Sequence, residues 1–256
     1  MDLLLKSLVG FVVGALIGMT GVGGGVLLLP ILIFGLHVPA MQAVGSDALF
    51  NFFTKIGASA VHLKRGTVRR KVVLALAVGS APGSLFGVTY LHHLRSLYGN
   101  GVNHFITVAV GVLLVCIPSF LFFQKKLEDR AAAKPPSIKS FAWMALIGLV
   151  AGILVGITSV GSGSIVMMML LLFYSFQPKE MVGTDIVHAL LLTGVTSFLH
   201  YQINHNIDLH LVGALLIGSI PGGLLGAYLS TRVPVPWLRR ILCAVLLATG
   251  ARMLMA

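Results

Sequence analysis

The sequence predicts an all-α integral membrane protein made of two homologous halves, and three observations support this prediction. Hydrophobic residues make up 57% of the chain, and its mean hydropathy is +0.99. Only 10% of the 256 residues are charged, whereas a soluble domain carries about 25%. So few charges cannot cover a water-facing surface, so lipid must be the solvent for much of the chain. The third observation is an internal repeat.

Apolar segments of spanning length cover most of the chain. They lie near residues 7–36, 39–62, 71–94, 102–123, 141–175, 179–201, 209–231 and 237–256. The first and fifth are longer than one crossing needs, and both are interrupted by glycine and small polar residues. The longest polar stretch follows the fourth segment and contains Pro135 and Pro136. We therefore expect a first transmembrane repeat at 1–124, a cytoplasmic linker at 125–140 and a second repeat at 141–256.

The repeat is visible residue by residue. Gly10, Gly14, Gly18, Thr20, Val22, Gly23 and Gly25 match Gly148, Gly152, Gly156, Thr158, Val160, Gly161 and Gly163. In the same register Gly45-Ser46-Asp47 matches Gly183-Thr184-Asp185, and with one extra residue the run 79–83 matches 218–222. Internal symmetry of this kind is typical of transporter folds.

The charge pattern bears on topology and partners. The net charge of +11 comes from short basic clusters between apolar segments, such as 64–71, 125–139 and 232–240. Basic clusters hold loops in the cytoplasm, so we expect the lipid bilayer as the partner and no nucleic acid. If segments one and five each cross once, the halves are parallel. If both are re-entrant hairpins, the halves are inverted and all three clusters lie inside, which is the arrangement we favour.

Two glycine-rich interruptions are the candidate substrate-binding site. They are Thr20-Gly21-Val22-Gly23-Gly24-Gly25 and Thr158-Ser159-Val160-Gly161-Ser162-Gly163. Each glycine costs about 1 kcal/mol in a helix relative to alanine, and a broken helix presents unbonded N–H groups that attract anions. Close helix packing through small residues is the alternative explanation.

Asp47, Asp185 and Lys55 are charged residues well inside apolar segments, where such residues are functional candidates. Asp47 and Asp185 either carry protons or brace the interruptions by accepting hydrogen bonds, and N-cap-like bonding is an option because both lie near the start of their segments. Lys55 shares a helical face with Asp47 and Asn51. It either binds an anionic substrate, pairs with Asp47 or extends towards the basic loop.

The remaining motifs have structural explanations. Pro82-Gly83 and Pro221-Gly222 lie in glycine ladders and serve as hinges or as close-packing points. His200, His205 and His210 are spaced by five residues and fall on different helical faces, so we expect no metal site, and we place His62 and His200 at the membrane interface. We expect no cofactor and no catalytic residue.

These motifs resemble those of the sulfite exporter TauE/SafE family, also called the toluene sulfonate uptake permease family. The resemblance rests on Gly-x-x-x-Gly-x-x-x-Gly-x-Thr-Gly-Val-Gly-Gly-Gly followed by Gly-Ser-Asp, and it extends over essentially the whole chain. It implies a multi-pass permease of the bacterial inner membrane for small anions such as sulfite or organosulfonates, with the glycine-rich interruptions facing the substrate path.

The functional hypothesis is a secondary transporter that binds a small anion at both interruptions, and a homo-oligomer is compatible with it. Three rivals remain: a cation or metabolite carrier that uses Asp47 and Asp185, a non-transporting assembly subunit, and a membrane enzyme. The enzyme is disfavoured because the sequence holds no nucleophile–base pair, metal set or cofactor motif.

Overall fold

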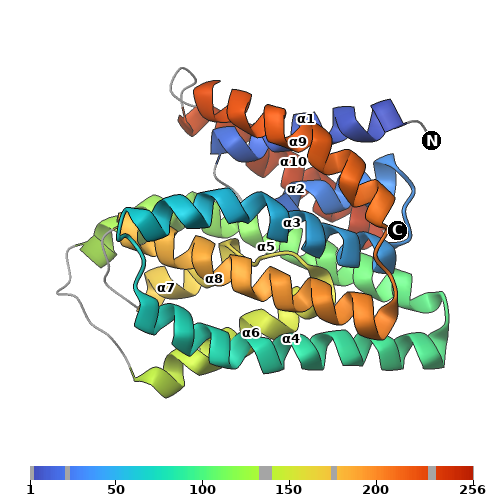
Figure 1. Cartoon of the computed structure of the whole chain (residues 1–256), viewed down its shortest axis with the longest axis horizontal. Helices are drawn as coiled ribbons and strands as arrows, with labels where there is room; N and C mark the ends of the chain where they lie inside the picture. The colour runs from blue at the N-terminus through green and yellow to red at the C-terminus, as the bar shows by residue number, and fades with distance from the viewer. Residues whose placement is uncertain (1–2, 21–23, 133–139, 174–177, 230–234, 256) are drawn as a thin grey trace.

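The computed structural model describes residues 3–20, 24–132, 140–173, 178–229 and 235–255, and every element in these ranges is helical (Figure 1). The elements are α1 (Leu3–Thr20), α2 (Gly24–Pro30), η1 (Ile31–Gly35), α3 (Ala40–Lys64), α4 (Arg70–Tyr98), α5 (Gly101–Ala132), α6 (Phe141–Thr158), α7 (Ser164–Phe173), α8 (Pro178–Leu199), η2 (His200–Asn204), α9 (Leu209–Leu229) and α10 (Val235–Met255). η1 and η2 are π-helical turns. The predicted all-α fold is confirmed.

Five stretches are long and apolar enough to cross a membrane: Arg70–Tyr98, Gly101–Pro118, Phe141–Thr158, Lys179–Asn204 and Leu209–Gly226. Leu3–Met19 and Gly25–Gly35 are shorter apolar helices. The first and fifth apolar segments of the sequence are each divided into separate helices, α1 with α2–η1 and α6 with α7. The protein is a multi-pass membrane protein.

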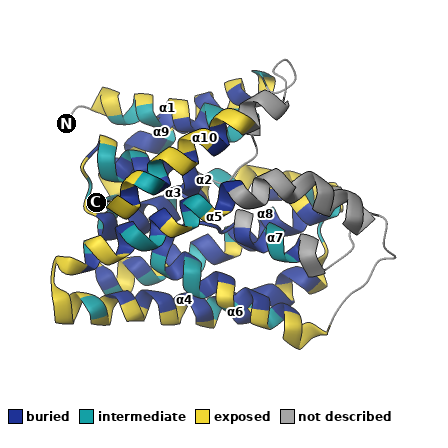
Figure 2. Ribbon diagram, turned by 180° about the vertical axis from the view of Figure 1, so that it is seen from behind, coloured by how far each residue is buried: buried dark blue, intermediate teal, exposed yellow. Residues whose placement is uncertain are grey.

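Large apolar side chains cover the outer surface of the helices. Leu74, Ile217 and Leu224 are 61%, 63% and 71% exposed, and Figure 2 shows such exposed positions along the outside of the bundle, with buried positions between the helices. An apolar surface of this extent is stable when its solvent is lipid. The exposed faces therefore mark the lipid contact.

The first helix of each half packs against a helix of the other half. By the sequence repeat α1, α2, α3, α4 and α5 are equivalent to α6, α7, α8, α9 and α10. In the structure α1 packs along α9 and α6 packs along α4, so each helix lies against the other half. Added side chains would collide with a main-chain carbonyl at Gly10 (Leu215), Gly14 (Ser219), Gly148 (Leu76) and Gly152 (Ser80). These contacts are related by the repeat, and glycine is needed there because the backbones touch.

The equivalent helices α3 and α8 run antiparallel. Phe52 lies against Gly194, the Ser59 hydroxyl lies 3.4 Å from the Ile186 carbonyl, and His62 lies against Gly183. Along this series the numbering rises on α3 and falls on α8. The pseudo-two-fold axis therefore runs across the helices, in the plane of the membrane, and the halves are inverted. Equivalent positions of the two helices lie opposite each other at about Thr54 on α3 and Leu192 on α8, so the axis passes between these residues.

The ends of the molecule differ in charge. In Figure 1 both termini and the start of α3 lie at one end, and the α3–α4 turn lies at the other. The α3–α4 turn carries the densest basic cluster, residues 64–71. α1 and α2–η1 therefore lead away from one end and back to it, as a re-entrant hairpin does. Below, the end with the α3–α4 turn is the basic end, and the other is the terminal end.

Candidate functional site

The second glycine-rich interruption breaks a helix in the interior of the protein. α6 ends at Thr158 and α7 begins at Ser164. Ser159 has a φ of 55° and Gly161 a φ of 90°, and the left-handed backbone at these positions turns the chain. Within the described part of the chain, the N–H groups of Gly161, Ser162 and Gly163 have no hydrogen-bond acceptor. They are donors available to a ligand.

Hydrogen bonds of Thr158 and Val160 stabilise this turn. The Thr158 hydroxyl and the Val160 N–H are used in these bonds, so they are not available to a ligand. The Thr158 hydroxyl donates to the Leu154 carbonyl at 2.7 Å, and it accepts from the Val160 N–H at 3.2 Å. The Ser159 N–H donates to the Val155 carbonyl at 2.7 Å. The hydroxyl of Ser159 remains to contact the other half.

The first interruption is described only at its edges. α1 ends at Thr20 and α2 begins at Gly24, whereas Gly21, Val22 and Gly23 and the side chain of Thr20 lie outside the described residues. Gly25 is buried at the start of α2. It stands close to Asp47 and to the second interruption, as the next contacts show.

Asp47 joins the two halves at the second interruption. Its Oδ2 accepts a hydrogen bond from the Ser159 hydroxyl at 2.7 Å, and both residues are fully buried. A Cβ atom on Gly25 would lie 2.7 Å from the same Oδ2 and 3.0 Å from the Ser159 carbonyl oxygen. The carboxyl group therefore reaches the interruption only because residue 25 has no side chain.

Asp185 occupies the equivalent place in the second half. A Cβ atom on Gly163 would lie 3.2 Å from its Oδ2, and Gly163 is the repeat partner of Gly25. Oδ1 of Asp185 and Oδ1 of Asp47 are buried without a hydrogen-bond partner among the described residues. Both aspartates lie about two turns inside their helices, so the N-cap interpretation is wrong.

Lys55 completes a polar row along α3. Its Nζ donates to Asn51 Oδ1 at 3.0 Å, and Asn51 Nδ2 donates to the Asp47 carbonyl oxygen at 2.9 Å. Lys55 is half-buried, interacts electrostatically with both aspartates, and lies beside the pseudo-two-fold axis. Its hydrogen-bond partner is a neutral amide, and it forms no ion pair with Asp47 in the described chain. We call Asp47, Asn51, Lys55, Ser159 and Asp185 the central site.

Further buried polar contacts were not predicted from the sequence. Ser80 Oγ lies 3.0 Å from His188 Nε2, and Ser84 Oγ lies 2.8 Å from Thr196 Oγ1. Both pairs join α4 to α8 across the two halves. A polar stripe at helical spacing along α8, comprising Asp185, His188, Thr193 and Thr196, is the signal that would have indicated them.

His200 is not at the membrane interface, and that expectation is wrong. It is fully buried, and its Nε2 lies 3.0 Å from the Gly156 carbonyl oxygen. A carbonyl only accepts, so Nε2 carries the hydrogen and Nδ1 accepts from Asn206 Nδ2 at 3.2 Å. Two fixed partners hold the ring inside the bundle. His62, its repeat partner, is half-buried and contacts the Thr67 hydroxyl at 2.8 Å.

Pro82 and Pro221 lie inside α4 and α9. The glycines that follow them contact the partner helix. Side chains at Gly83 and Gly222 would collide with the carbonyl oxygens of Leu149 and Phe11. These contacts support the close-packing interpretation. A hinge role stays a prediction.

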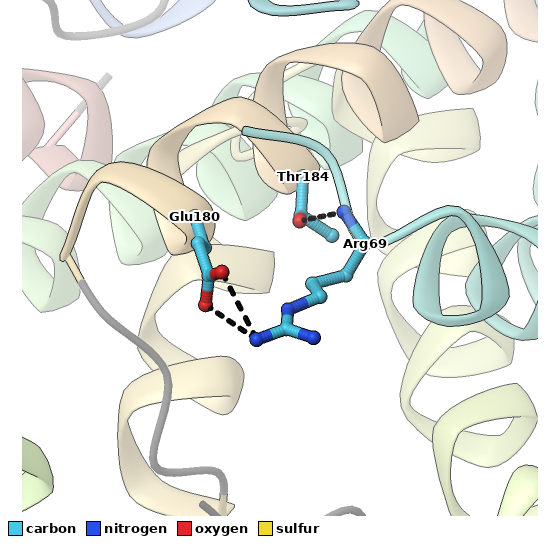
Figure 3. A network of polar contacts seen from close by, with 3 residues as sticks. All are labelled: Arg69, Glu180 and Thr184. Carbon is cyan, nitrogen blue, oxygen red and sulfur yellow. Dashed lines mark hydrogen bonds and ion pairs between the residues drawn. The ribbon is translucent and has the colours of Figure 1, made fainter. Parts of the chain in front are cut away.

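The two ends of the molecule share one contact between the halves and differ in another. The Arg69 N–H donates to the Thr184 hydroxyl at 3.0 Å, and the equivalent Asp208 N–H donates to the equivalent Ser46 hydroxyl at 3.0 Å. At the basic end Arg69 also forms an ion pair with Glu180 at 2.9 Å (Figure 3). At the terminal end Asp208 replaces Arg69 and Gln42 replaces Glu180. These two residues cannot form an ion pair, because the amide of Gln42 is neutral.

Inverted repeats, helices broken inside the bundle and a buried polar centre at the pseudo-two-fold axis together define a membrane transporter. The sequence comparisons agree. The family model of the sulfite exporter TauE/SafE matches residues 7–253, and the chain belongs to this family. No solved structure shows significant similarity to it.

Curated relatives carry transporter names. The chain is 34% identical over 250 residues to the probable membrane transporter protein YjnA of Bacillus subtilis, covering 96% of this chain and 98% of the relative. It is 25% identical to the probable membrane transporter protein YunE of the same organism, over 99% and 98% of the two chains. The probable membrane transporter protein MJ0441 of Methanocaldococcus jannaschii is 25% identical, over 98% and 95%.

Proposed function

We propose that this protein is a secondary permease of the bacterial plasma membrane that moves a small oxyanion, sulfite or an organosulfonate, and that the anion binds at the central site. The observation that carries the proposal is the position of Lys55. It is a half-buried cation on α3, beside the pseudo-two-fold axis, and its hydrogen-bond partner is neutral. A charged side chain among apolar segments is a functional candidate by default.

The donors around Lys55 suit an oxyanion. The N–H groups of Gly161, Ser162 and Gly163 face no protein acceptor among the described residues, and oriented amides of a broken helix favour negative charge. The family name, which mentions sulfite, supports this substrate class. Thr20 and Gly21–Gly23 are proposed to contribute in the same way from the first interruption.

The two aspartates set a condition on anion binding. Asp47 and Asp185 lie in the same centre as Lys55, so with all three ionised the centre carries one net negative charge. An anion binds there when at least one carboxyl group is protonated, because this lowers the repulsion. We therefore propose that a proton accompanies the anion, with the Asp47–Ser159 contact as the brace of the interruption.

Transport requires the central site to open to each side in turn. The inverted halves provide two related arrangements, because exchanging their conformations exchanges the open end. The contacts between α3 and α8 and the two N–H-to-hydroxyl bonds at the ends are the places where the halves would move. No nucleotide-binding motif occurs in the sequence, so the proposal uses ion gradients as the driving force.

The test is uptake into proteoliposomes that contain the purified protein. Sulfite, sulfate, thiosulfate and a sulfonate are offered separately, with and without a pH gradient, and protein-free liposomes are the control. We expect saturable uptake of at least one of these anions, accelerated by the pH gradient. Uptake of none of them under either condition contradicts the proposal. Uptake of a cation under the same gradients would favour the rival carrier that uses Asp47 and Asp185.

A further inference from the structure

A pocket opens at the terminal end, away from the central site. Its volume is about 470 Å³, and it lies between the last turns of α4 and the turn that follows η2. The lining residues are His92, Arg95, Ser96, Ile203, Asn204 and His205. We call it the mouth pocket.

The chemistry of the mouth pocket suits an anion. Its lining holds one guanidinium and two imidazoles and no carboxylate. Arg95 Nη1 donates to the Asn204 carbonyl oxygen at 3.2 Å, which holds the guanidinium against one wall. A guanidinium has five N–H donors, so the others are available to bind oxygen atoms, and planar guanidinium groups suit oxyanions.

A chain of polar contacts leads from the mouth pocket into the bundle. Asn204 is 3% exposed, and its Nδ2 lies 3.5 Å from His200 Nδ1. His200 Nε2 in turn donates to the Gly156 carbonyl oxygen, three residues before Ser159. His92 Nδ1 lies 3.3 Å from Asn204 Oδ1 on the side of the pocket. The mouth pocket and the second interruption are therefore linked by side chains that hydrogen-bond in sequence.

The other half shows that the fold does not require these residues. At the positions equivalent to Asn204 and Asn206 the sequence has Arg65 and Thr67, and at those equivalent to His92 and Arg95 it has Thr231 and Pro234. One contact recurs, because the His62 ring lies 2.8 Å from the Thr67 hydroxyl as the His200 ring lies 3.2 Å from Asn206, but Asn204 and Arg95 have no counterpart of the same type. At the basic end the Arg69–Glu180 ion pair joins the α3–α4 turn to α8 (Figure 3).

We propose that the mouth pocket is a second binding site for the small oxyanion, which the anion occupies on its way between the terminal end and the central site, with Arg95 as its main contact. This inference rests on the proposed function for the identity of the anion. Because the basic end faces the cytoplasm by the positive-inside rule, the mouth pocket faces the outside.

The experiment uses the full-length protein in right-side-out and inside-out membrane vesicles. Sulfite uptake is measured against concentration for the wild type, Arg95→Gln and Arg95→Lys. Lys6→Gln is the control, because it removes a positive charge from α1 near the same end and outside the pocket. We expect Arg95→Gln to raise KM about fivefold or more in right-side-out vesicles at unchanged kcat, since lost ground-state binding acts on KM. Arg95→Lys should have a smaller effect, and Lys6→Gln none.

Two results would contradict anion binding in the mouth pocket. One is an unchanged KM for sulfite in Arg95→Gln, and the other is the same increase in KM in both vesicle orientations. Equilibrium binding of radiolabelled sulfite to the detergent-purified variants is measured in parallel and does not depend on transport. If the wild type transports no sulfite but binds it in an Arg95-dependent way, the proposed function fails and the mouth pocket stands. If the wild type neither transports nor binds sulfite, both fail. A melting curve for each variant shows that it is folded.

Discussion

Asp47 and Ser159 form the residue-scale contact on which the central site depends. The hydroxyl of Ser159 donates to a carboxylate oxygen that is otherwise surrounded by buried groups. The repeat partner of Ser159 in the sequence is Gly21, which has no side-chain hydroxyl. A left-handed φ of 55° at Ser159 also suits glycine. Ser159→Gly therefore removes the hydrogen bond and keeps the backbone.

We predict that Ser159→Gly lowers the free energy of unfolding by about 1–3 kcal/mol, because it removes a hydrogen bond to a buried carboxyl group whose other oxygen already has no partner among the described residues. The rate of sulfite transport should fall with it. Thermal unfolding in detergent and proteoliposome flux measure the two effects. Thr89→Ala is the matched control, since it removes an exposed hydroxyl that bonds only within α4. Equal stability of Ser159→Gly and the wild type would contradict the proposed brace.

Part of the central site was accessible from the sequence. Asp47, Asp185 and Lys55 stand out as charges in apolar segments, and the repeat pairs the two interruptions. The partners could not be predicted, because a helical period tells which residues share a face but not what lies opposite. The row Asp47, Asn51, Lys55 was visible in the spacing. The contact of Asp47 with Ser159 depends on the crossing of helices from different halves.

At the scale of helices, glycine ladders hold α1 against α9 and α6 against α4. Their close backbone contact explains why glycine recurs at four-residue spacing in both pairs. The sequence indicated the ladders but not which helices they join. Packing of α1 on α4 within one half and packing of α1 on α9 of the other half would need the same glycine pattern. In the structure both ladders join helices of different halves.

We predict that Gly218→Ala destabilises the protein by about 1–3 kcal/mol, as overpacking does when neither backbone can yield. The added methyl would collide with the Ser7 carbonyl oxygen and come within 2.7 Å of the Phe11 nitrogen. Gly213→Ala on the same helix is the control, because nothing lies within 4 Å of its added Cβ, and alanine should stabilise a helix there by up to about 1 kcal/mol. Similar melting temperatures for the two variants would argue against the ladder.

The Arg69–Glu180 ion pair gives a second prediction at this scale. It joins the α3–α4 turn to the first turn of α8 at the basic end, and it must break when that end opens. An exposed pair contributes up to about 1 kcal/mol, which is about a fivefold change in population. Arg69→Glu should therefore change the transport rate by up to about fivefold, and Arg69→Glu with Glu180→Arg should restore it. A double variant that behaves like the single variant would show that the pair does not act on transport.

At the scale of the whole molecule, the antiparallel contact of α3 with α8 gives the halves opposite orientations. The charge pattern of the sequence had favoured this arrangement, and the structure supplies the geometric reason. What composition could not give is the position of the axis next to Lys55, because that depends on the register of two helices far apart in the chain.

The inverted topology predicts that both termini lie outside the cytoplasm and that residues 125–139 lie inside it. A compartment-sensitive reporter fused to the C-terminus should give a periplasmic signal, and the same reporter inserted into 125–139 should give a cytoplasmic one. The insertion serves as the control for expression and folding. A cytoplasmic signal from the C-terminal fusion would overturn the orientation.

The central claim is that a small anion crosses this protein at Lys55, and sulfite flux through Lys55→Gln tests it most directly. Loss of one charge-assisted contact of about 1.5–3 kcal/mol should reduce sulfite flux about tenfold or more, while Lys6→Gln keeps the wild-type rate. Melting curves confirm that both variants are folded. Sulfite flux through Lys55→Gln equal to that of the wild type would contradict the account.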